Sequence, residues 1–351
     1  MGQETGGALT HLIFLAQVLN EHNIDNTLLF FEDGTVAKAA KAVGLKYKII
    51  NQKNTQEWIN YLNKEKFDFV QTHGPRSNFL VSLQRKKIHA PQIITVHSDP
   101  KLDFLGSGLK GKIASKLNVW SLKRASGLFV VSSEIKKQLI GLGIKSDTIH
   151  QINNAIWFSP TVPKKKPHDF MQVIIVARLH PVKAHERLLQ ALAKINLSQI
   201  HLHIVGDGSL RESLENLVNE KKLQSQVHFY GALKRNEIDQ LYPKMDLALI
   251  VSRSEGFPLV FLEAANSAVP VLMTDLSASK LLIPDSKYGI VVENSLEGIQ
   301  AGLKKAFEMG PLKLEEIGKN SRRYAMAHFG ADNFFQQLNQ GYESFSKKNK
   351  I

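Results

Sequence analysis

Short apolar segments alternate with helical segments along almost all of this chain. In the first half, strand-like runs such as TLLFF, QIITVHS and GLFVVSS are separated by stretches with apolar residues at helical spacing, for example residues 8–22. The second half repeats the pattern, from MQVIIVAR to VPVLMT. Strands that are apolar on both faces are typical of a parallel sheet covered by helices on both sides. The pattern therefore predicts an α/β fold built from doubly wound parallel sheets.

The length and one proline-rich segment predict two such domains. A chain of 351 residues can bury two ordinary cores. Residues 159–169 hold three prolines and a lysine run, which favours a linker, with a surface loop inside one domain as the alternative. We expect a first domain over 1–158, a second over 170–328, and a C-terminal helix over 329–351 that packs toward the first domain. The two domains should face one cleft, because ligands of such sheets bind at the carboxyl ends of the strands.

The charge balance indicates an anionic partner. Lys and Arg number 45 against 32 Asp and Glu, a formal charge of +13, which suits phosphate, a membrane surface or nucleic acid. There is no cysteine, so disulfides and thiolate chemistry are excluded. No apolar run approaches the roughly 20 residues of a membrane span, and the first residues do not read as a signal peptide. We therefore expect a cytoplasmic protein.

The segment SRSEGFPLVFLEAA, residues 252–265, carries two glutamates around seven uncharged residues. We expect a helix with Pro258 at its first position, which places Glu263 in the second turn. A carboxylate there needs a partner, because an unpaired buried charge is costly. Glu255 lies in the loop before this helix, near backbone N–H groups that favour anions. The pair therefore predicts a ligand site, whereas a buried helix with charged ends is the alternative.

Two cations at another strand end favour a diphosphate. In ARLHPVKAHERLL, Arg178 follows a predicted strand and Lys183 opens a helix. Arginine can clamp two oxygens and lysine adds a point charge, although plain surface solvation remains an alternative. In VGDGSLRE, Gly206 and Gly208 predict a tight turn, and Asp207 would either contact a ligand or cap the next helix.

The first half also carries candidate ligand-binding residues, with glycines before a predicted helix and histidines at the ends of predicted strands. The stretch GQETGGALTH predicts a glycine loop in which Gly6 and Gly7 allow close approach to a phosphate or sugar. His73 and His97 each end a predicted strand and could bond a sugar hydroxyl or move a proton. The His-Ser-Asp run at 97–99 has no third metal ligand at suitable spacing, so we predict no zinc site there.

Residues 105–126 predict a basic amphipathic helix. An apolar stripe is flanked by lysines and one arginine, and the helix either packs against the protein or binds an anionic bilayer surface. The stripe consists of Leu109, Ile113, Leu117 and Trp120, and the cations are Lys110, Lys112, Lys116, Lys123 and Arg124.

Taken in order, these motifs resemble those of the family 4 retaining glycosyltransferases of the GT-B fold, of the type that builds bacterial polysaccharides and glycolipids. The matching stretches are GGALTH, TVH, ARL with the lysine that follows, VGDG, SEGFPLVFLEA and PVL. The resemblance extends over nearly the whole chain. Its most specific part is the pair of glutamates eight positions apart with Gly-Phe-Pro between them.

The resemblance implies a role for each motif. Glu263 would bind the ribose of a sugar nucleotide, and Glu255 would bind the donor sugar. Arg178 and Lys183 would neutralise the departing diphosphate, and His97 would lie beside the donor sugar and the acceptor. The implied catalytic set is His97, Glu255, Arg178 and Lys183, and the implied donor-binding set is Gly7, Gly206, Gly256, Phe257, Pro258, Leu259 and Glu263.

The activity implied is transfer of a sugar from a nucleotide diphosphate sugar to a saccharide or lipid-linked acceptor, with a UDP-sugar favoured over a GDP-sugar. No Asp-x-Asp motif is present, so no metal and no other cofactor is expected. We also expect no nucleic acid partner, and a cytoplasmic protein that could lie on the inner face of the membrane. The alternatives are an inactive or truncated partner subunit, or a GT-B epimerase or phosphorylase. A nicotinamide dehydrogenase is disfavoured, since no Gly-x-Gly-x-x-Gly follows a first strand.

Three features depart from the family pattern. Only Met1 to Thr5 precede the glycine pair, too few residues to cross a sheet at about 3.3 Å per residue. Ala155 and Ala268 stand where the family usually has glycine. We therefore expect an apolar slot in the first sheet where a strand should lie, and a first domain that is less stable than the second.

Overall fold

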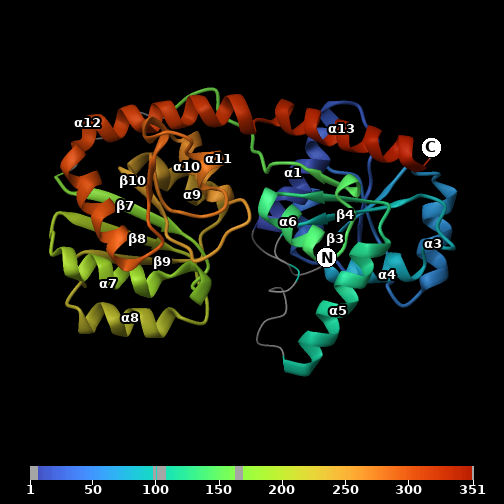
Figure 1. The fold of residues 1–351 in the computed structure, drawn as a ribbon, viewed down its shortest axis with the longest axis horizontal. Coiled ribbons are helices and arrows are strands. Elements are labelled where there is room, and N and C mark those ends of the chain that lie inside the picture. The colour runs from blue at the N-terminus through green and yellow to red at the C-terminus, as the bar shows by residue number, and fades with distance from the viewer. Residues whose placement is uncertain (1–6, 98–99, 101–107, 163–168, 350–351) are drawn as a thin grey trace. The chain divides into compact units, whose positions relative to one another are not determined.

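The computed structural model describes residues 7–97, 100, 108–162 and 169–349 (Figure 1). The chain forms two compact units, one of residues Met1–Ala155 and Ala331–Ile351 and the other of residues Ile156–Gly330. It therefore passes from the first unit to the second just before residue 158, where we placed the end of the first domain. The range 159–169 falls in the second unit, and 163–168 lie outside the described residues. The helix at the C-terminus belongs to the first unit.

The first unit alternates strands and helices in the predicted order. Its strands are β1 (Leu28–Phe30), β2 (Tyr47–Ile49), β3 (Val70–His73), β4 (Gln92–Val96), β5 (Gly127–Val130) and β6 (Ile149–Gln151). Its helices are α1 (Gly7–Glu21), α2 (Thr35–Ala42), α3 (Thr55–Lys64), α4 (Pro75–Leu83), α5 (Gly108–Arg124), α6 (Ser133–Gly141), the 3-10 turn η1 (Ser146–Thr148) and α13 (Ala331–Asn349).

These strands form two separate parallel sheets. One has the order β3-β4-β5-β6, and the other consists of β1 and β2 alone. Among the described residues, β1 and β3 do not pair with each other. The strands β4 and β5 are buried throughout, as expected for strands covered by helices on both faces.

The second unit has one continuous sheet. Its strands are β7 (Met171–Val176), β8 (Ile200–Val205), β9 (Val227–Gly231), β10 (Leu247–Ile250), β11 (Val271–Thr274) and β12 (Ile290–Val292). Its helices are α7 (His185–Ile195), α8 (Arg211–Glu220), α9 (Arg235–Leu241), α10 (Leu259–Asn266), α11 (Ser279–Leu282) and α12 (Leu296–Phe329), with 3-10 turns η2 (Pro181–Lys183), η3 (Tyr242–Lys244) and η4 (Ser286–Tyr288).

All six strands of this sheet run parallel in the order β12-β11-β10-β7-β8-β9. Figure 1 shows helices on both faces of it. The chain order reverses beside β7, the first strand, and this reversal is where ligands bind in sheets of this kind. The predicted α/β class with doubly wound parallel sheets is confirmed.

Candidate active site

The loops that leave β7, β8 and β10 lie next to one another, because those three strands are neighbours in the second sheet. The backbone N–H of Arg253 donates to the carbonyl of Val182 over 2.7 Å, which joins the loop after β10 to the loop after β7. From α7, the Arg187 guanidinium donates to the carbonyls of Val251 and Asn294 at 2.8 and 2.9 Å. The two loops are therefore fixed to each other before any ligand arrives.

Lys183 and Glu255 meet where these loops join. The Lys183 ammonium forms an ion pair with Glu255 Oε1, and Ser252 Oγ donates to the same oxygen over 2.7 Å. The Lys183 and Glu255 side chains are only 20% and 14% exposed. The fold thus brings together one cation and one carboxylate to which the family resemblance gives different parts of the donor, the diphosphate and the sugar.

Arg178 follows β7 but does not join this pair. Arg178 is exposed, and its guanidinium makes no ion pair with the described residues. The guanidinium can therefore bind an anion without giving up an existing partner. The structure therefore leaves Arg178 as an open cation near the end of β7, while Lys183 already has a partner.

The turn after β8 has room only for glycine at positions 206 and 208, in agreement with the tight turn predicted there. A Cβ on Gly206 would lie 1.9 Å from the Ala177 carbonyl oxygen, and one on Gly208 would lie 2.5 Å from the Leu179 carbonyl oxygen. Asp207 caps no helix, because its carboxylate accepts the N–H of Gly208 at 2.7 Å and α8 begins only at Arg211. The capping alternative for Asp207 is therefore wrong.

The segment between the two glutamates is shaped by its apolar residues. Pro258 is the N-cap of α10, so the helix begins at Leu259, one position later than expected. Phe257 is buried, and its ring lies edge-on to Phe329 of α12 with centroids 5.4 Å apart. The N–H groups of Gly256 and Leu259 have no hydrogen-bond partner among the described residues. This is the anion-binding geometry expected at the start of a helix.

Glu263 has a partner that the sequence analysis missed. The Arg235 guanidinium of α9 forms an ion pair with Glu263 Oε1 and bonds Asp239 at 2.9 Å. Burial raises the pKa of the Glu263 carboxyl above its usual value, although the Arg235 guanidinium acts in the opposite direction. Tyr242 is buried beside them, and burial raises the pKa of its hydroxyl well above the usual value. The need of Glu263 for a cation was evident, but nothing in the spacing singled out Arg235.

In the first unit, three histidines from distant parts of the chain converge. His73 ends β3, His97 follows β4, and Nδ1 of the former lies 3.2 Å from Nε2 of the latter. His11 of α1 packs edge-on to His97 with ring centroids 4.7 Å apart, and its Nδ1 bonds Asn154 Oδ1 at 3.0 Å. The buried Nε2 of His11 has no partner among the described residues.

Burial keeps this cluster neutral. It lowers the pKa of His11 to about 4 and that of His73 to about 3, and it lowers the pKa of His97 well below its usual value. We predicted no zinc site at 97–99 because no third ligand stands at suitable spacing in the sequence, but the fold brings His11 and His73 to His97 from distant positions. One ring nitrogen from each of the three histidines lies within 4.8 Å of the others. Ser98 and Asp99 lie outside the described residues, as does Gly6, whereas Gly7 is the first residue of α1.

Comparison with protein families finds one match in each half of the chain. Residues 5–157 match the model described as Glycosyltransferase Family 4, and residues 161–324 match the one described as Glycosyl transferases group 1. The chain belongs to the family 4 glycosyltransferases. The two matches meet close to the point where the chain passes between the structural units.

Relatives of this family 4 member include two proteins of Escherichia coli. The O-antigen biosynthesis glycosyltransferase WbnH is 32% identical over 205 residues, which cover 58% of this chain and 56% of WbnH. The O-antigen biosynthesis glycosyltransferase WclY is 25% identical over 291 residues, which cover 78% of each. The match to WbnH thus covers little more than half the length of that relative.

A solved structure shares the family's fold over nearly all of the chain. Anabaena Alr3699/HepE, determined in complex with UDP and glucose, superposes with a TM-score of 0.84 at 17% identity, covering 98% of both chains. That likeness confirms the predicted GT-B fold. Among the described residues of this family member, no helix is both long and apolar enough to cross a bilayer.

Proposed function

We propose that this protein transfers a sugar from a nucleotide diphosphate sugar to a saccharide or lipid-linked acceptor in the synthesis of a surface polysaccharide. The observation that carries the proposal is the junction of Lys183, Glu255 and Ser252 at the ends of β7 and β10. At this junction Lys183 would stabilise the departing phosphate, and the Glu255 carboxylate would accept hydrogen bonds from hydroxyls of the donor sugar. Similarity to O-antigen enzymes supports the class of product.

A UDP-sugar is the proposed donor. Glu263 would accept hydrogen bonds from the ribose, and the free N–H groups of Gly256 and Leu259 would bind phosphate or sugar oxygens. UDP and glucose occupy the solved structure of Anabaena HepE, which supports this donor class.

The proposed chemistry develops positive charge at the anomeric carbon and negative charge on the departing diphosphate. Lys183, Arg178 and the N-terminus of α10 would stabilise that negative charge without a metal ion. We propose front-face attack with retention of configuration, in which the leaving phosphate takes the acceptor proton. No protein nucleophile is then needed. The neutral ring of His97 would act as a hydrogen-bond partner for sugar or acceptor.

A panel of nucleotide sugars tests this function. A donor that binds only the folded state at 100 times its Kd raises the free energy of unfolding by about 2.7 kcal/mol. We expect a UDP-sugar to raise the melting temperature more than the GDP-sugars, and the same UDP-sugar to be consumed with an acceptor extract. An inactive partner subunit would show no shift with any donor. Formation of a free epimer would point to an epimerase instead.

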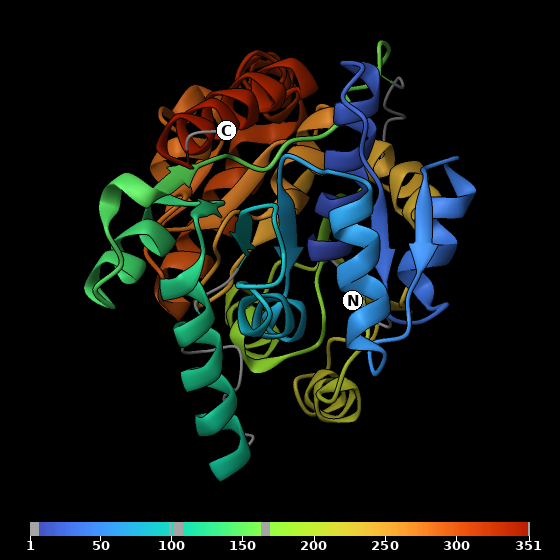
Figure 2. The same cartoon turned by 90° about the vertical axis from the view of Figure 1, so that its right-hand side faces the viewer.

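The exposed face of α5 supports a membrane-surface acceptor. Figure 2 shows α5 extending away from the sheet of its unit. Ile113, Leu117 and Trp120 are 54%, 40% and 36% exposed, while Asn118 and Leu122 form part of the buried face. The helix still packs against its unit, since the Trp120 ring lies 5.9 Å from that of Phe79, so both alternatives for the stripe stay open, and Leu109 is not among the side chains described. Apolar residues between lysines suit an anionic bilayer surface.

Vesicle co-sedimentation tests this part of the proposal. We expect binding to anionic vesicles that weakens as salt rises, because exposed charges are screened over about 8–10 Å at physiological ionic strength. Ile113→Ser with Leu117→Ser should reduce binding, whereas Leu312→Ser, at an exposed leucine of the second unit, serves as the control. Equal binding to neutral vesicles would contradict an electrostatic mode.

A further inference from the structure

His11, His73 and His97 of the first unit form one group, called the histidine cluster below. They come from α1, from the end of β3 and from the residue after β4, so three separate elements bring their imidazoles together. One ring nitrogen from each lies within 4.8 Å of the others, and the described ranges hold no second group of three histidines or carboxylates so arranged. The proposed function uses only His97, and the other two histidines call for a reason of their own.

The two ring nitrogens of His11 have different surroundings. Nδ1 lies 3.0 Å from Asn154 Oδ1, and since this amide oxygen can only accept, Nδ1 carries the proton and Nε2 carries the lone pair. Nε2 is buried and has no hydrogen-bond partner among the described residues, which is a costly state for a polar atom. A metal ion requires such a lone pair. A bond from the opposite nitrogen to an oxygen acceptor is also the usual way in which a metal-binding imidazole is oriented.

His73 and His97 present two further nitrogens at a spacing that fits coordination. Nδ1 of His73 lies 3.2 Å from Nε2 of His97. Two nitrogens bound to one tetrahedral zinc ion, each at about 2.0–2.1 Å, lie about 3.3 Å apart. These two atoms therefore already have the separation of neighbouring ligands. The third nitrogen, at most 4.8 Å away, has to approach by roughly 1.5 Å, which rotation of the rings can supply.

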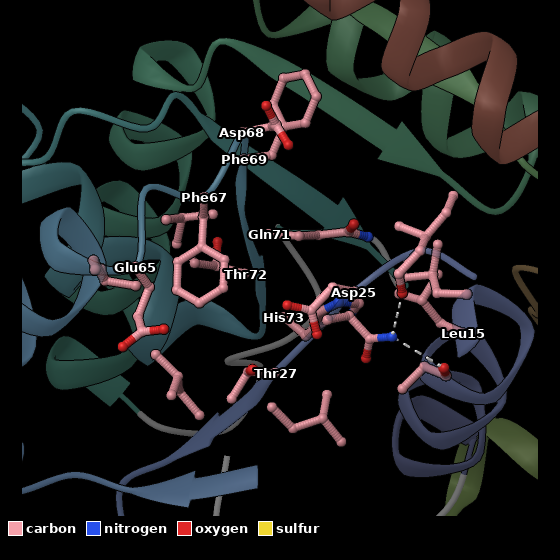
Figure 3. A pocket seen from close by; sticks show the side chains of 18 of the residues that line it. Leu15, Asp25, Thr27, Glu65, Phe67, Asp68, Phe69, Gln71, Thr72 and His73 are labelled. Atoms are coloured by element: carbon pink, nitrogen blue, oxygen red, sulfur yellow. Dashed lines mark hydrogen bonds between the residues drawn. The ribbon is translucent and has the colours of Figure 1, made fainter. Parts of the chain in front are cut away.

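The strand that carries His73 is held in place by its own hydrogen bonds. Figure 3 looks into a cavity of about 590 Å³ in the first unit, with Gln71, Thr72 and His73 labelled among the side chains that line it. Gln71 Nε2 donates to Thr95 Oγ1 at 2.7 Å, and Thr72 Oγ1 donates to Asn78 Oδ1 at 2.8 Å. These bonds fix the end of β3 before any ion arrives. A ligand held in position in advance lowers the entropic cost of binding.

The donor atoms decide which class of ion fits the cluster. Imidazole nitrogen is a ligand for Zn²⁺ and related transition-metal ions, whereas Mg²⁺ and Ca²⁺ take oxygen ligands. In the part of the chain that the structure describes, no carboxylate joins the group. Three imidazoles leave the fourth position of a tetrahedral ion to water or another small ligand. The cluster therefore suits an ion of the zinc class.

We propose that His11, His73 and His97 form a binding site for a divalent transition-metal ion of the zinc class, and that occupancy of this site inhibits sugar transfer. The second half rests on the proposed function, in which the His97 ring contacts the sugar or the acceptor. A ring bound to a metal ion is held at the cluster and can no longer turn toward a hydroxyl. The ion is thus an inhibitor and not a cofactor, in agreement with a transfer step whose positive charge comes from Lys183 and Arg178.

Titration of Zn²⁺ into untagged, chelator-treated protein tests the site without any substrate. We expect one ion per chain to bind tightly, and Co²⁺ in its place to give the visible absorption of a four-coordinate ion with nitrogen ligands. Asn154→Leu keeps all three ligands but removes the oxygen that orients His11, so it should weaken binding by about 10–100-fold. His11→Gln and His97→Gln, which each remove a ligand, should weaken it further. Circular dichroism and thermal unfolding establish that each variant is folded.

The second unit supplies a matched control. His201 and His228 also lie close together, with ring centroids 5.6 Å apart, but they are not part of the cluster. The double variant His201→Gln with His228→Gln should bind Zn²⁺ as the parent does, and Mg²⁺ should not displace Co²⁺ from the parent. Absence of tight Zn²⁺ binding in the parent, or equal affinity in the parent and His11→Gln, would overturn the site. Loss of binding in the control variant alone would overturn it as well.

The rate of sugar transfer at increasing Zn²⁺ concentration tests the second half. Each protein is compared with its own rate without zinc, so a changed basal rate in a variant does not affect the result. We expect Zn²⁺ to inhibit the parent, and the concentration for half inhibition to rise by about 10–100-fold in Asn154→Leu, in step with the loss of binding. Tight binding that leaves the rate unchanged would refute the inhibitory role. A protein that transfers no sugar from any donor would contradict the proposed function, whereas the binding titrations would still decide the site.

Discussion

Lys183 and Glu255 form an ion pair across 72 positions of sequence, and Ser252 donates to the same carboxylate oxygen. A ligand phosphate that binds Lys183 must therefore share this cation with Glu255. The arrangement holds both side chains in place and leaves the second oxygen of Glu255 for a sugar hydroxyl. Positioning of this kind lowers the entropic cost of binding the donor.

We predict that Lys183 and Glu255 act on different parts of the donor. Lys183→Met should weaken binding of UDP by about 1.5–3 kcal/mol, the range for a hydrogen bond to a charged group. Glu255→Gln should leave UDP affinity almost unchanged and reduce sugar transfer. Isothermal titration with UDP and turnover with the donor sugar measure the two effects. Glu215→Gln, which removes an exposed ion pair with Arg211, is the control. Equal loss of UDP affinity in both variants would refute the division of roles.

Glu263 should govern nucleotide affinity. Glu263→Gln keeps the size of the side chain but weakens charge-assisted hydrogen bonds to the ribose, so nucleotide affinity should fall by roughly 1.5–3 kcal/mol. Asp239→Asn is the matched control, because Asp239 bonds the same Arg235 from an exposed position. It should leave affinity unchanged. If the two variants bind UDP equally well, the ribose assignment of Glu263 is incorrect.

The order of strands and helices could be predicted because each element carries its own periodicity. The positions of His73 and His97 could be predicted because each follows or ends an apolar strand. The turn at Gly206 and Gly208 could be predicted in the same way, because it follows the apolar strand β8. Side-chain partners could not be predicted in this way. Arg235 reaches Glu263 from another helix, and His11 reaches His97 from α1, through packing that no local spacing encodes. The start of α10 shifted by one residue, because Pro258 serves as the cap.

Turnover should survive removal of metal ions. Lys183, Arg178 and the start of α10 would supply the positive charge for the departing diphosphate, so excess EDTA should not reduce the rate. The measurement is initial rate with and without EDTA on protein dialysed against the chelator. Loss of activity that magnesium or manganese restores would contradict a metal-independent mechanism. Restoration by zinc alone would direct attention to the cluster of His11, His73 and His97.

Stability should fall as the solution is acidified, in part because of His185. This ring is fully buried, neither ring nitrogen has a partner among the described residues, and burial, with a smaller effect of Lys183, lowers its pKa to about 4. Below pH of about 6.5 the unfolded chain binds a proton at this ring that the folded chain does not bind until about pH 4. The free energy of unfolding therefore decreases across this window, by up to about 1.4 kcal/mol per pH unit.

Denaturant titrations at several pH values check this effect. His185→Leu should reduce the slope between pH 6.5 and 4 for the second unit, while circular dichroism at pH 7.5 confirms that the variant is folded. The pKa values of His11, His73 and His97 are also lowered by burial, so the stability of the first unit should keep its own pH dependence in this variant. A variant with the same slope as the parent would show that the pKa of His185 does not differ between the folded and the unfolded chain.

Ala268 should be a site of stored backbone strain. It follows α10 with φ of +52°, and the N–H groups of Ala268 and Val269 donate to Ala265 and Ala264 at 2.9 Å, the Schellman pattern in which glycine is preferred. The turn has no room to relax, because a Cβ on Gly318 of α12 would lie 2.0 Å from the Ala268 carbonyl oxygen.

Ala268→Gly should therefore stabilise the second unit. The left-handed conformation costs a non-glycine residue about 1–2 kcal/mol, whereas the added freedom of glycine in the unfolded chain costs about 0.4–1 kcal/mol. With the loss of one buried methyl group, we expect a net gain of at most about 1 kcal/mol, measured by thermal and denaturant unfolding. Ala265→Gly, in the right-handed part of the same helix, should instead destabilise by about 1 kcal/mol. If both variants lose stability to the same extent, the turn at Ala268 carries no strain that glycine can relieve.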